Sequence, residues 1–247
     1  MHEVLVTRMG RTPLWTAIRD TLRDEIAAGR YSAGDQLPTE ARLADRFGVN
    51  RHTVRRALAG LGEAGIVHAR RGAGVFVAQP QTMYPLGRRV RFHRNLLAAG
   101  REPRRQVLNL EQRKADMREA EALKLPQKAL VQVFEGLSFA DAVPIAVFRS
   151  VFPAGRFPGM LKALGKTPSV TAAFKAMGLT DYTRAGTEIT AKRASPTIAS
   201  HLAITSGDPI LRTVSVNIDP DGRAIEYGRT WFAGDRIAFS IGEMPEA

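Results

Sequence analysis

Apolar residues follow a helical rhythm through the first 80 positions of the chain. A stripe with one apolar residue in every four predicts an amphipathic helix over residues 14–28, which Gly29 ends. Thr39 is placed to cap a second helix that runs to Arg46. A third helix is expected over about residues 51–63, with an apolar face that consists of Val54, Leu58 and Leu61. The segment "IVHARRGAGVFV" then predicts two short strands around a glycine-containing tip.

The pattern changes in the second part of the chain. Strand-like runs cover 129–139, 143–152, 183–193, 209–218 and 224–232, and the turn "DPDG" joins the last two as a hairpin. Helices are expected over 92–99, 116–123, 169–177 and 196–202. Strands connected by hairpins favour an antiparallel sheet with helices on one side, which is an α+β fold. We therefore expect one domain over 1–78, a linker over 79–90 and a second domain over 91–247.

The charge of the chain is concentrated in one region. The net charge is +12, and the first 114 residues account for +11 of it, with 21 Lys and Arg against 10 Asp and Glu. A basic part joined to a nearly neutral part is typical of a protein that meets a polyanion through one region only. Charge alone leaves a solubilising basic surface open as the alternative.

The composition also limits the chemistry of the chain. Without cysteine there is no disulfide framework and no thiolate metal site, and no apolar run approaches the roughly 20 residues that cross a bilayer. The segment "GLSFA" matches a nucleophile elbow only in part, and "GAGVFV" lacks the third glycine of a dinucleotide fingerprint. The five histidines have no metal-ligand spacing. We expect a cytoplasmic protein without membrane association, catalysis, metal or cofactor.

The third helix combines its apolar face with basic residues on the other side, and these are Arg51, His52, Arg55 and Arg56. Like charges four residues apart repel each other, so the pattern indicates an external anion. A helix that follows a tight turn and presents arginines can enter the major groove of double-stranded DNA, with Thr53 at the same end. Asn50 is either the helix N-cap or a reader of adenine. A solvated basic helix is the alternative.

The expected hairpin supports this interpretation, because its tip carries Arg70, Arg71 and Gly72. A basic tip at this distance would contact a neighbouring groove or phosphate, as the wing of a winged helix does. Glycine at such a tip allows close approach of the backbone to DNA.

Specific motifs resemble a known family. The segment "LPTEARLADRFGVNRHTVRRALAGLGEAGIVHARRGAGVFV", residues 37–77, resembles the DNA-binding domain of the GntR superfamily of bacterial repressors. The segments "YPLGRRVRFHRNLLAAG", "PSVTAAFKAMGL" and "AIEYGRTWFAGDRIAFSI" are similar to the effector-binding (UTRA) domain of the HutC subfamily. "VNRHTVRRAL" together with the first of these resembles PhnF-like regulators of phosphonate metabolism. The similarities cover nearly the whole chain after residue 12.

The resemblance implies a winged helix-turn-helix domain followed by a chorismate-lyase-like (UTRA) α+β domain with an antiparallel sheet. It also implies a homodimer that binds a two-fold-symmetric operator and responds to a small-molecule effector. Family DNA contacts map onto Asn50, Arg51, Arg55, Arg71 and Gly72. Many relatives have Arg at the position of Ala41; whether Arg42, the next residue, replaces it stays open.

The resemblance implies an effector site, but three positions of this chain depart from the family pattern. Relatives that sense sugar phosphates have arginines at positions that Gly136, Ser138 and Ala233 occupy here, so a sugar phosphate is disfavoured. A phosphonate or similar small anion is the leading hypothesis, and loss of the effector response is the alternative. The candidate residues are Arg91, Arg149, Ser169, Arg184, Glu226 and Tyr227.

Each candidate has a structural alternative. Ser169 could bind an anion or only cap a helix, and Arg91 could simply begin a basic helix. Arg149 lies in an apolar strand and could pair with Glu135 or Glu226 instead of a ligand. As a whole, the chain is expected to be a ligand-responsive repressor; the competing function is a non-specific nucleic-acid-binding protein whose second domain only dimerises.

Overall fold

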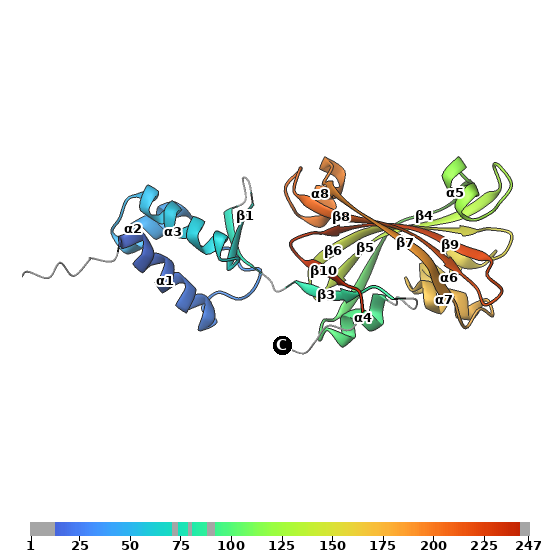
Figure 1. Cartoon of the computed structure of the whole chain (residues 1–247), viewed down its shortest axis with the longest axis horizontal. Coiled ribbons are helices and arrows are strands. Elements are labelled where there is room, and N and C mark those ends of the chain that lie inside the picture. Colours follow the sequence, from blue (N-terminus) through green and yellow to red (C-terminus); the bar gives the residue numbers. More distant parts are fainter. Residues whose placement is uncertain (1–12, 71–73, 79–80, 88–91, 243–247) are drawn as a thin grey trace, which may run out of the picture. The chain divides into compact units, whose positions relative to one another are not determined.

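The computed structural model describes residues 13–70, 74–78, 81–87 and 92–242. The chain divides into two compact units, Met1–Pro80 and Gln81–Ala247, each of which has its own hydrophobic core. Figure 1 shows the helices of the first unit and the large sheet of the second.

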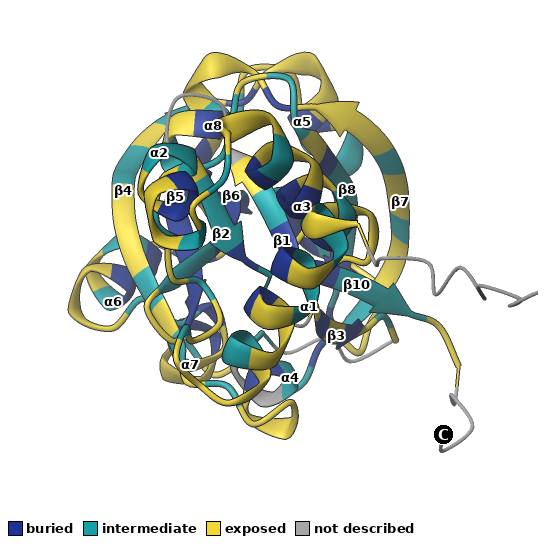
Figure 2. Ribbon diagram, turned by 90° about the vertical axis from the view of Figure 1, so that its left-hand side faces the viewer, coloured by how far each residue is buried: buried dark blue, intermediate teal, exposed yellow. Residues whose placement is uncertain are grey.

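The first unit has three helices and a hairpin. Its elements are α1 (Leu14–Ala27), α2 (Glu40–Phe47), α3 (Arg51–Glu63), β1 (Val67–Arg70) and β2 (Gly74–Val77). The expected helices and the strands of the expected hairpin are confirmed. The apolar stripes of α1 and α3 pack together in one core. Leu14 is the exception within its stripe, since it is 67% exposed at the first residue of α1. Buried and exposed residues alternate along α1 and α3 in Figure 2.

The second unit contains a six-stranded antiparallel sheet in the order β4-β5-β6-β9-β8-β7. The strands are β4 (Pro103–Lys114), β5 (Leu130–Ala140), β6 (Val143–Pro153), β7 (Thr183–Arg193), β8 (Pro209–Ile218) and β9 (Ala224–Ala233). Five of them match the expected runs, and the antiparallel α+β fold is confirmed. The edge strand β4 was not expected from the sequence. Its residues are exposed or half-buried, as the colours of β4 in Figure 2 indicate, so the chain there lacks an apolar pattern.

Helices cover both faces of this sheet, which corrects the expectation of one covered face. The helices α4 (Phe92–Ala98), α6 (Met160–Lys166) and α7 (Val170–Ala176) lie on one side. On the other side are α5 (Met117–Ala122) and α8 (Pro196–Leu202), as Figure 1 shows. Successive residues of a strand point to opposite faces, so β5 and β6 can supply two cores. Phe134 and Phe148 pack with α6 and α7, whereas Leu137 and Val147 pack with α8.

The expected linker is only partly a linker. Within 79–90 the chain forms β3 (Thr82–Pro85), which pairs in parallel with β10 (Ile237–Ser240). Thr82 and Tyr84 are buried and alternate with exposed residues, a strand pattern that the neighbouring prolines and polar residues conceal in the sequence. The second unit therefore includes the segment that directly follows the first.

Candidate DNA-binding surface and effector cavity

The start of α3 is fixed by a capped turn. Gly48 ends α2 in the left-handed conformation, at φ 63°, which glycine adopts without strain. Asn50 then caps α3, because its Oδ1 accepts a hydrogen bond from the backbone N–H of Thr53 at 2.9 Å. The Thr53 hydroxyl donates to the same oxygen at 3.0 Å. The structure thus gives Asn50 the capping role that the sequence left open.

The apolar face of α3 anchors the helix, and its basic face is exposed. Val54 and Leu61 are fully buried, and Leu58 nearly so. Arg51 and His52 are exposed in the first turn of the helix, beside the turn from α2. The free N–H groups of a helix start add to the positive potential of these two side chains. This end of α3 is therefore suited to meet phosphate or base edges.

Arg55 and Arg56 have partners within the protein. Arg55 donates from Nε and Nη2 to the two carboxylate oxygens of Glu40, at 2.9 and 2.7 Å. These hydrogen bonds hold the pKa of Glu40 below its usual value. The Arg56 guanidinium lies 4.7 Å from the ring centroid of Trp15 on α1, a cation–π contact. Both side chains are exposed and point outward as expected, but each also has a partner within the protein, which the sequence did not indicate.

The remaining DNA-contact candidates are less defined. Arg42 is exposed on α2, and its backbone N–H donates to the capping hydroxyl of Thr39 at 3.4 Å. Arg70 is the last residue of β1, in register with Gly74. The side chain of Arg70 lies outside the described part of the chain, as do Arg71 and Gly72 entirely.

The second unit contains a cavity of about 550 Å³ between the sheet and the helices α4 and α7. Aromatic side chains such as Tyr84, Phe148 and Tyr182 form much of its wall. Its charged lining within the described residues consists of Arg105, Lys175, Arg184 and Glu226. A partly apolar cavity with a few convergent polar groups is the usual form of a small-molecule site.

Three of the expected effector residues line this cavity. Ser169 lies at the start of α7, where its Oγ accepts from the N–H of Ala172 at 3.3 Å. Arg184 on β7 donates from Nε to Oδ1 of Asn217 at 3.3 Å. Glu226 on β9 is buried, and its carboxylate accepts from Ser150 Oγ and Asn217 Nδ2, both at 2.6 Å. These side chains come from separate strands and one helix end, so only the fold brings them together.

Arg149 and Tyr227 do not line the cavity, which corrects two candidates. Strand alternation turns both toward the opposite face of the sheet. Arg149 forms an ion pair with Glu135 there, the structural alternative that the sequence left open. Tyr227 is buried in the core beneath α5. Arg91 lies outside the described residues.

Arg105 is a cavity residue that the sequence did not indicate. Its guanidinium carbon lies 4.7 Å from the ring centroid of Phe92 and 4.8 Å from that of Phe148. Its Nε is buried, no described residue accepts a hydrogen bond from it, and burial lowers the pKa of this arginine. The sequence does not mark Arg105 as a candidate because it lies on the unexpected strand β4, next to the exposed Arg104.

The three positions that lack family arginines differ in their surroundings. A Cβ atom at Gly136 would lie 2.5 Å from the carbonyl oxygen of Gln106 and 2.7 Å from the ring of Phe148. Ala233 is fully buried in the core beneath α8. Ser138 lines the cavity, directly opposite Arg105 in the register of β4 and β5.

No helix among the described residues is long and apolar enough to cross a membrane. Over the same part of the chain, His, Asp and Glu form no group of three that could hold a metal ion. A helix-turn-helix with a basic exposed face, joined to an α+β unit with a ligand-sized cavity, defines a transcription regulator.

Comparison with known proteins gives the family. Residues 14–77 match the model of the bacterial regulatory proteins of the gntR family, and residues 98–238 match the UTRA domain. The chain belongs to the GntR family, with a UTRA domain, and is a transcription regulator and not an enzyme.

The relatives extend over almost the whole chain. An uncharacterized HTH-type transcriptional regulator of Rhizobium meliloti (strain 1021) is 40% identical over 238 residues, which cover 96% of this chain and 98% of the relative. The mannosyl-D-glycerate transport/metabolism system repressor MngR of Escherichia coli (strain K12) is 28% identical over 94% of this chain and 97% of its own. The crystal structure of PhnF from Mycobacterium smegmatis matches with a TM-score of 0.61 at 28% identity, covering 93% of this chain and all of the PhnF chain. The chain thus resembles the HutC/PhnF-like subfamily.

Proposed function

We propose that this regulator is a repressor that binds an inverted-repeat operator as a homodimer and leaves it when a small anion fills the cavity of the second unit. The observation that carries the proposal is the form of α3, in which a buried apolar face anchors exposed Arg51 and His52 at a capped helix start. The repressor function of the E. coli relative supports the sign of regulation. Such a protein acts in the cytoplasm, on nucleoid DNA.

The proposed DNA contacts follow from this arrangement. Arg51, His52 and Arg55 contact bases or phosphates in the major groove, while Asn50 and Thr53 hold the helix start. Arg42 and Arg56 add charge at the flanks. The wing residues Arg70, Arg71 and Gly72 belong to the proposal through the family resemblance.

The chain offers a route from the cavity to the DNA-binding unit. The strand β3 begins two residues after Pro80, where the first unit ends, and its Tyr84 forms part of the cavity wall. The following Leu86 also lines the cavity. A ligand that contacts these side chains favours one arrangement of the segment that leads to the helix-turn-helix. Two linked DNA-binding units would then lose their fit to half-sites on one face of the duplex.

Cationic groups in the cavity support an anionic effector. Arg105, Arg184 and Lys175 line it, and a phosphonate fits both this charge and the resemblance to PhnF-like regulators. The test is a footprint on the promoter next to the protein's own gene at physiological salt, titrated with phosphonates and phosphate esters. Protection of a two-fold-symmetric site that a ligand abolishes is the expected result. Sedimentation of the free protein measures the dimer.

A second function, non-specific nucleic-acid binding by a dimer without effector response, has one supporting observation. Arg55 and Arg56 each have a partner inside the protein, which reduces the set of arginines that are available to read bases. Equal affinity for the promoter and for scrambled duplexes would favour this function and would exclude the repressor.

A further inference from the structure

Arg105 is a cation in the wall of the cavity that forms no ion pair with a described carboxylate, although the charge of Glu226 acts on it at longer range. Its guanidinium lies between the rings of Phe92 and Phe148, and it forms neither an ion pair nor a hydrogen bond with any residue that the structure describes. Removing a guanidinium from water without a hydrogen-bond acceptor is unfavourable. Stacking on two rings offsets part of this loss, but it leaves the buried Nε–H without an acceptor among the described residues. A ligand oxygen is the partner that this side chain lacks.

The position of Arg105 brings a positive charge to the part of the cavity wall that β5 forms. Arg105 and Ser138 are direct neighbours across β4 and β5, and both face the cavity. A long side chain on one strand reaches the space above its cross-strand neighbour. Arg105 can therefore supply a positive charge above Ser138. The Phe148 ring fills the space beside Gly136, so an arginine there would have no room.

Glu226 is the opposite case, a buried carboxylate in the same cavity wall. Ser150 and Asn217 each donate one hydrogen bond to it, and these two donors fix the plane of the carboxylate. No ion pair joins Glu226 to a Lys, Arg or His of the described chain. Each oxygen of an ionised carboxylate can accept further hydrogen bonds. Glu226 can therefore accept a further hydrogen bond, from a donor other than the described Lys, Arg and His residues.

Arg105 and Glu226 line one cavity, carry opposite charges and do not pair with each other. From this arrangement we propose that the effector is a small zwitterion, with an acidic group at Arg105 and Arg184 and an ammonium group at Glu226. The described lining has three cationic side chains and one anionic one. The excess favours an acid with two negative charges, so an aminoalkyl phosphonate or phosphate fits better than an amino acid. The inference rests on the proposed effector role of this cavity.

Calorimetric titration of the full-length protein tests the inference with pairs of ligands that differ only in the amine. One pair is 2-aminoethylphosphonate and ethylphosphonate; the second is glucosamine 6-phosphate and glucose 6-phosphate. We expect the amino member of at least one pair to bind tenfold or more tightly than its partner. Equal affinities within both pairs, or no binding of any of the four compounds, would overturn the inference.

Variants assign the two ends of the ligand. Glu226→Gln should abolish the preference for the amino member while affinity for the other member stays unchanged. Arg105→Gln should weaken both members at least tenfold, and Arg105→Lys should recover part of that loss. Arg104→Gln, a neighbour exposed on β4, is the matched control and should bind like the wild type. An unaltered preference in Glu226→Gln, or unaltered affinity in Arg105→Gln, contradicts the proposal.

Operator binding by each variant without ligand is measured in parallel, which also tests whether the variants fold. Selective binding of the zwitterion without any sequence preference on DNA would remove the proposed repressor function and leave this inference intact. Sequence-specific DNA binding without amine selectivity would overturn this inference and leave the proposed repressor function intact.

Discussion

The carboxylate of Glu40, in the first turn of α2, accepts two hydrogen bonds from the guanidinium of Arg55 in α3. The pair ties the two helices of the helix-turn-helix together on its exposed side. It also orients an arginine that the family resemblance places at the DNA. We expect a carboxylate at this position to repel phosphate and so to direct Arg55 away from non-specific backbone contacts.

Glu40→Gln should therefore reduce sequence preference more than affinity. The neutral amide holds Arg55 less firmly and no longer repels phosphate, so we expect tighter binding to scrambled duplexes and weaker discrimination of the operator. Because the pair is exposed, the melting temperature should hardly change. Fluorescence anisotropy with the operator duplex and a scrambled duplex measures the ratio of the two affinities. Glu63→Gln, an exposed change at the other end of α3, is the control. An unchanged ratio would show that Glu40 does not position Arg55.

Arg51→Ala should weaken operator binding by about 1–3 kcal/mol if this side chain reads a base, and should relax the preference at one position of the half-site. Arg51 is exposed in the first turn of α3, the part of the helix that the proposed function places in the major groove. Titrations at several salt concentrations separate a base contact from a phosphate contact. A uniform loss on all sequences, together with a lower salt slope, indicates a phosphate contact. Arg23→Ala removes the same charge from the exposed side of α1 and should have little effect.

The hydrophobic periodicity of the sequence predicts most helices and strands, because in these elements the apolar positions are also the buried ones. The apolar stripe of α3 reflects one face that packs against a core, and the apolar runs of β5 and β6 reflect strands that are buried on both faces. The strand β4 escaped because an edge strand with many solvated side chains needs no apolar pattern. In the same way, β3 is defined by its pairing with β10, more than 150 positions away, which no local pattern contains.

The candidate sites show the same limit. A basic face on α3 was predictable because exposed residues of a helix follow its period. Which polar residues of the second unit share a cavity depends on strand register and on the direction of each side chain. Arg149 was a candidate because charge is rare in an apolar strand, yet its register partner Glu135 neutralises it on the opposite face. Arg105 was missed since its strand was missed.

Gly136→Ala should destabilise the second unit. The added methyl group would lie 2.5 Å from a backbone oxygen of β4, which cannot move without breaking strand pairing. We expect a loss of about 1–3 kcal/mol in the free energy of unfolding, as for other overpacked positions. Urea unfolding followed by circular dichroism measures it. Gly186→Ala is the matched control, because Gly186 also lies in a strand and a Cβ there meets nothing within 4 Å. Equal effects of the two changes would contradict the steric argument.

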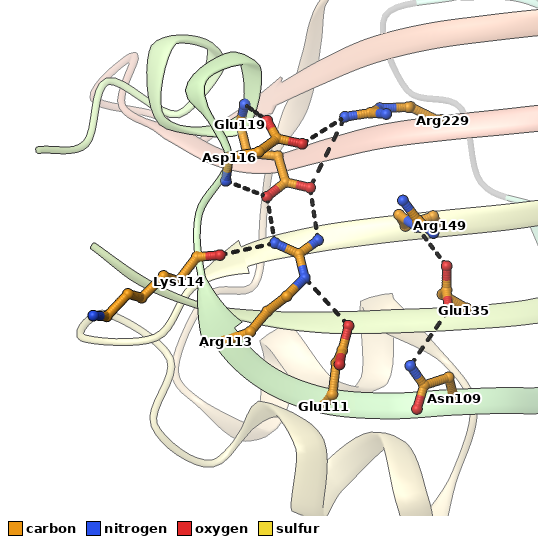
Figure 3. A network of polar contacts seen from close by, with 9 residues as sticks. All are labelled: Asn109, Glu111, Arg113, Lys114, Asp116, Glu119, Glu135, Arg149 and Arg229. Atoms are coloured by element: carbon orange, nitrogen blue, oxygen red, sulfur yellow. Dashed lines mark hydrogen bonds and ion pairs between the residues drawn. The ribbon is translucent and has the colours of Figure 1, made fainter. Parts of the chain in front are cut away.

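Glu119, at the start of α5, should make the stability of the second unit depend on pH. Its side chain is fully buried, and it accepts from Arg113 at 2.6 and 2.8 Å and from the N–H of Asp116 at 3.0 Å (Figure 3). Burial alone would raise the pKa of Glu119, but these donors outweigh it and the pKa lies below the usual value. A lowered pKa in the folded state gives stability that is present above the unfolded pKa. That stability is lost as the pH falls through the folded pKa.

Glu119→Gln should lower the free energy of unfolding at pH 7 by an amount on the order of 2–3 kcal/mol, because Arg113 keeps a neutral partner in place of its counter-ion. The difference from wild type should begin to shrink as the pH falls below about 4.5, where the carboxyl of the unfolded chain takes up a proton, and should be lost once the pH lies below the lowered pKa of the folded state. The two tryptophans are Trp15 and Trp231, so urea unfolding in a Trp15→Phe background reports on the second unit alone. Glu121→Gln, exposed on the same helix, should unfold like its parent at every pH. A Glu119→Gln difference that stayed constant from pH 7 to pH 3.5 would show that shape, and not charge, holds α5 to the sheet.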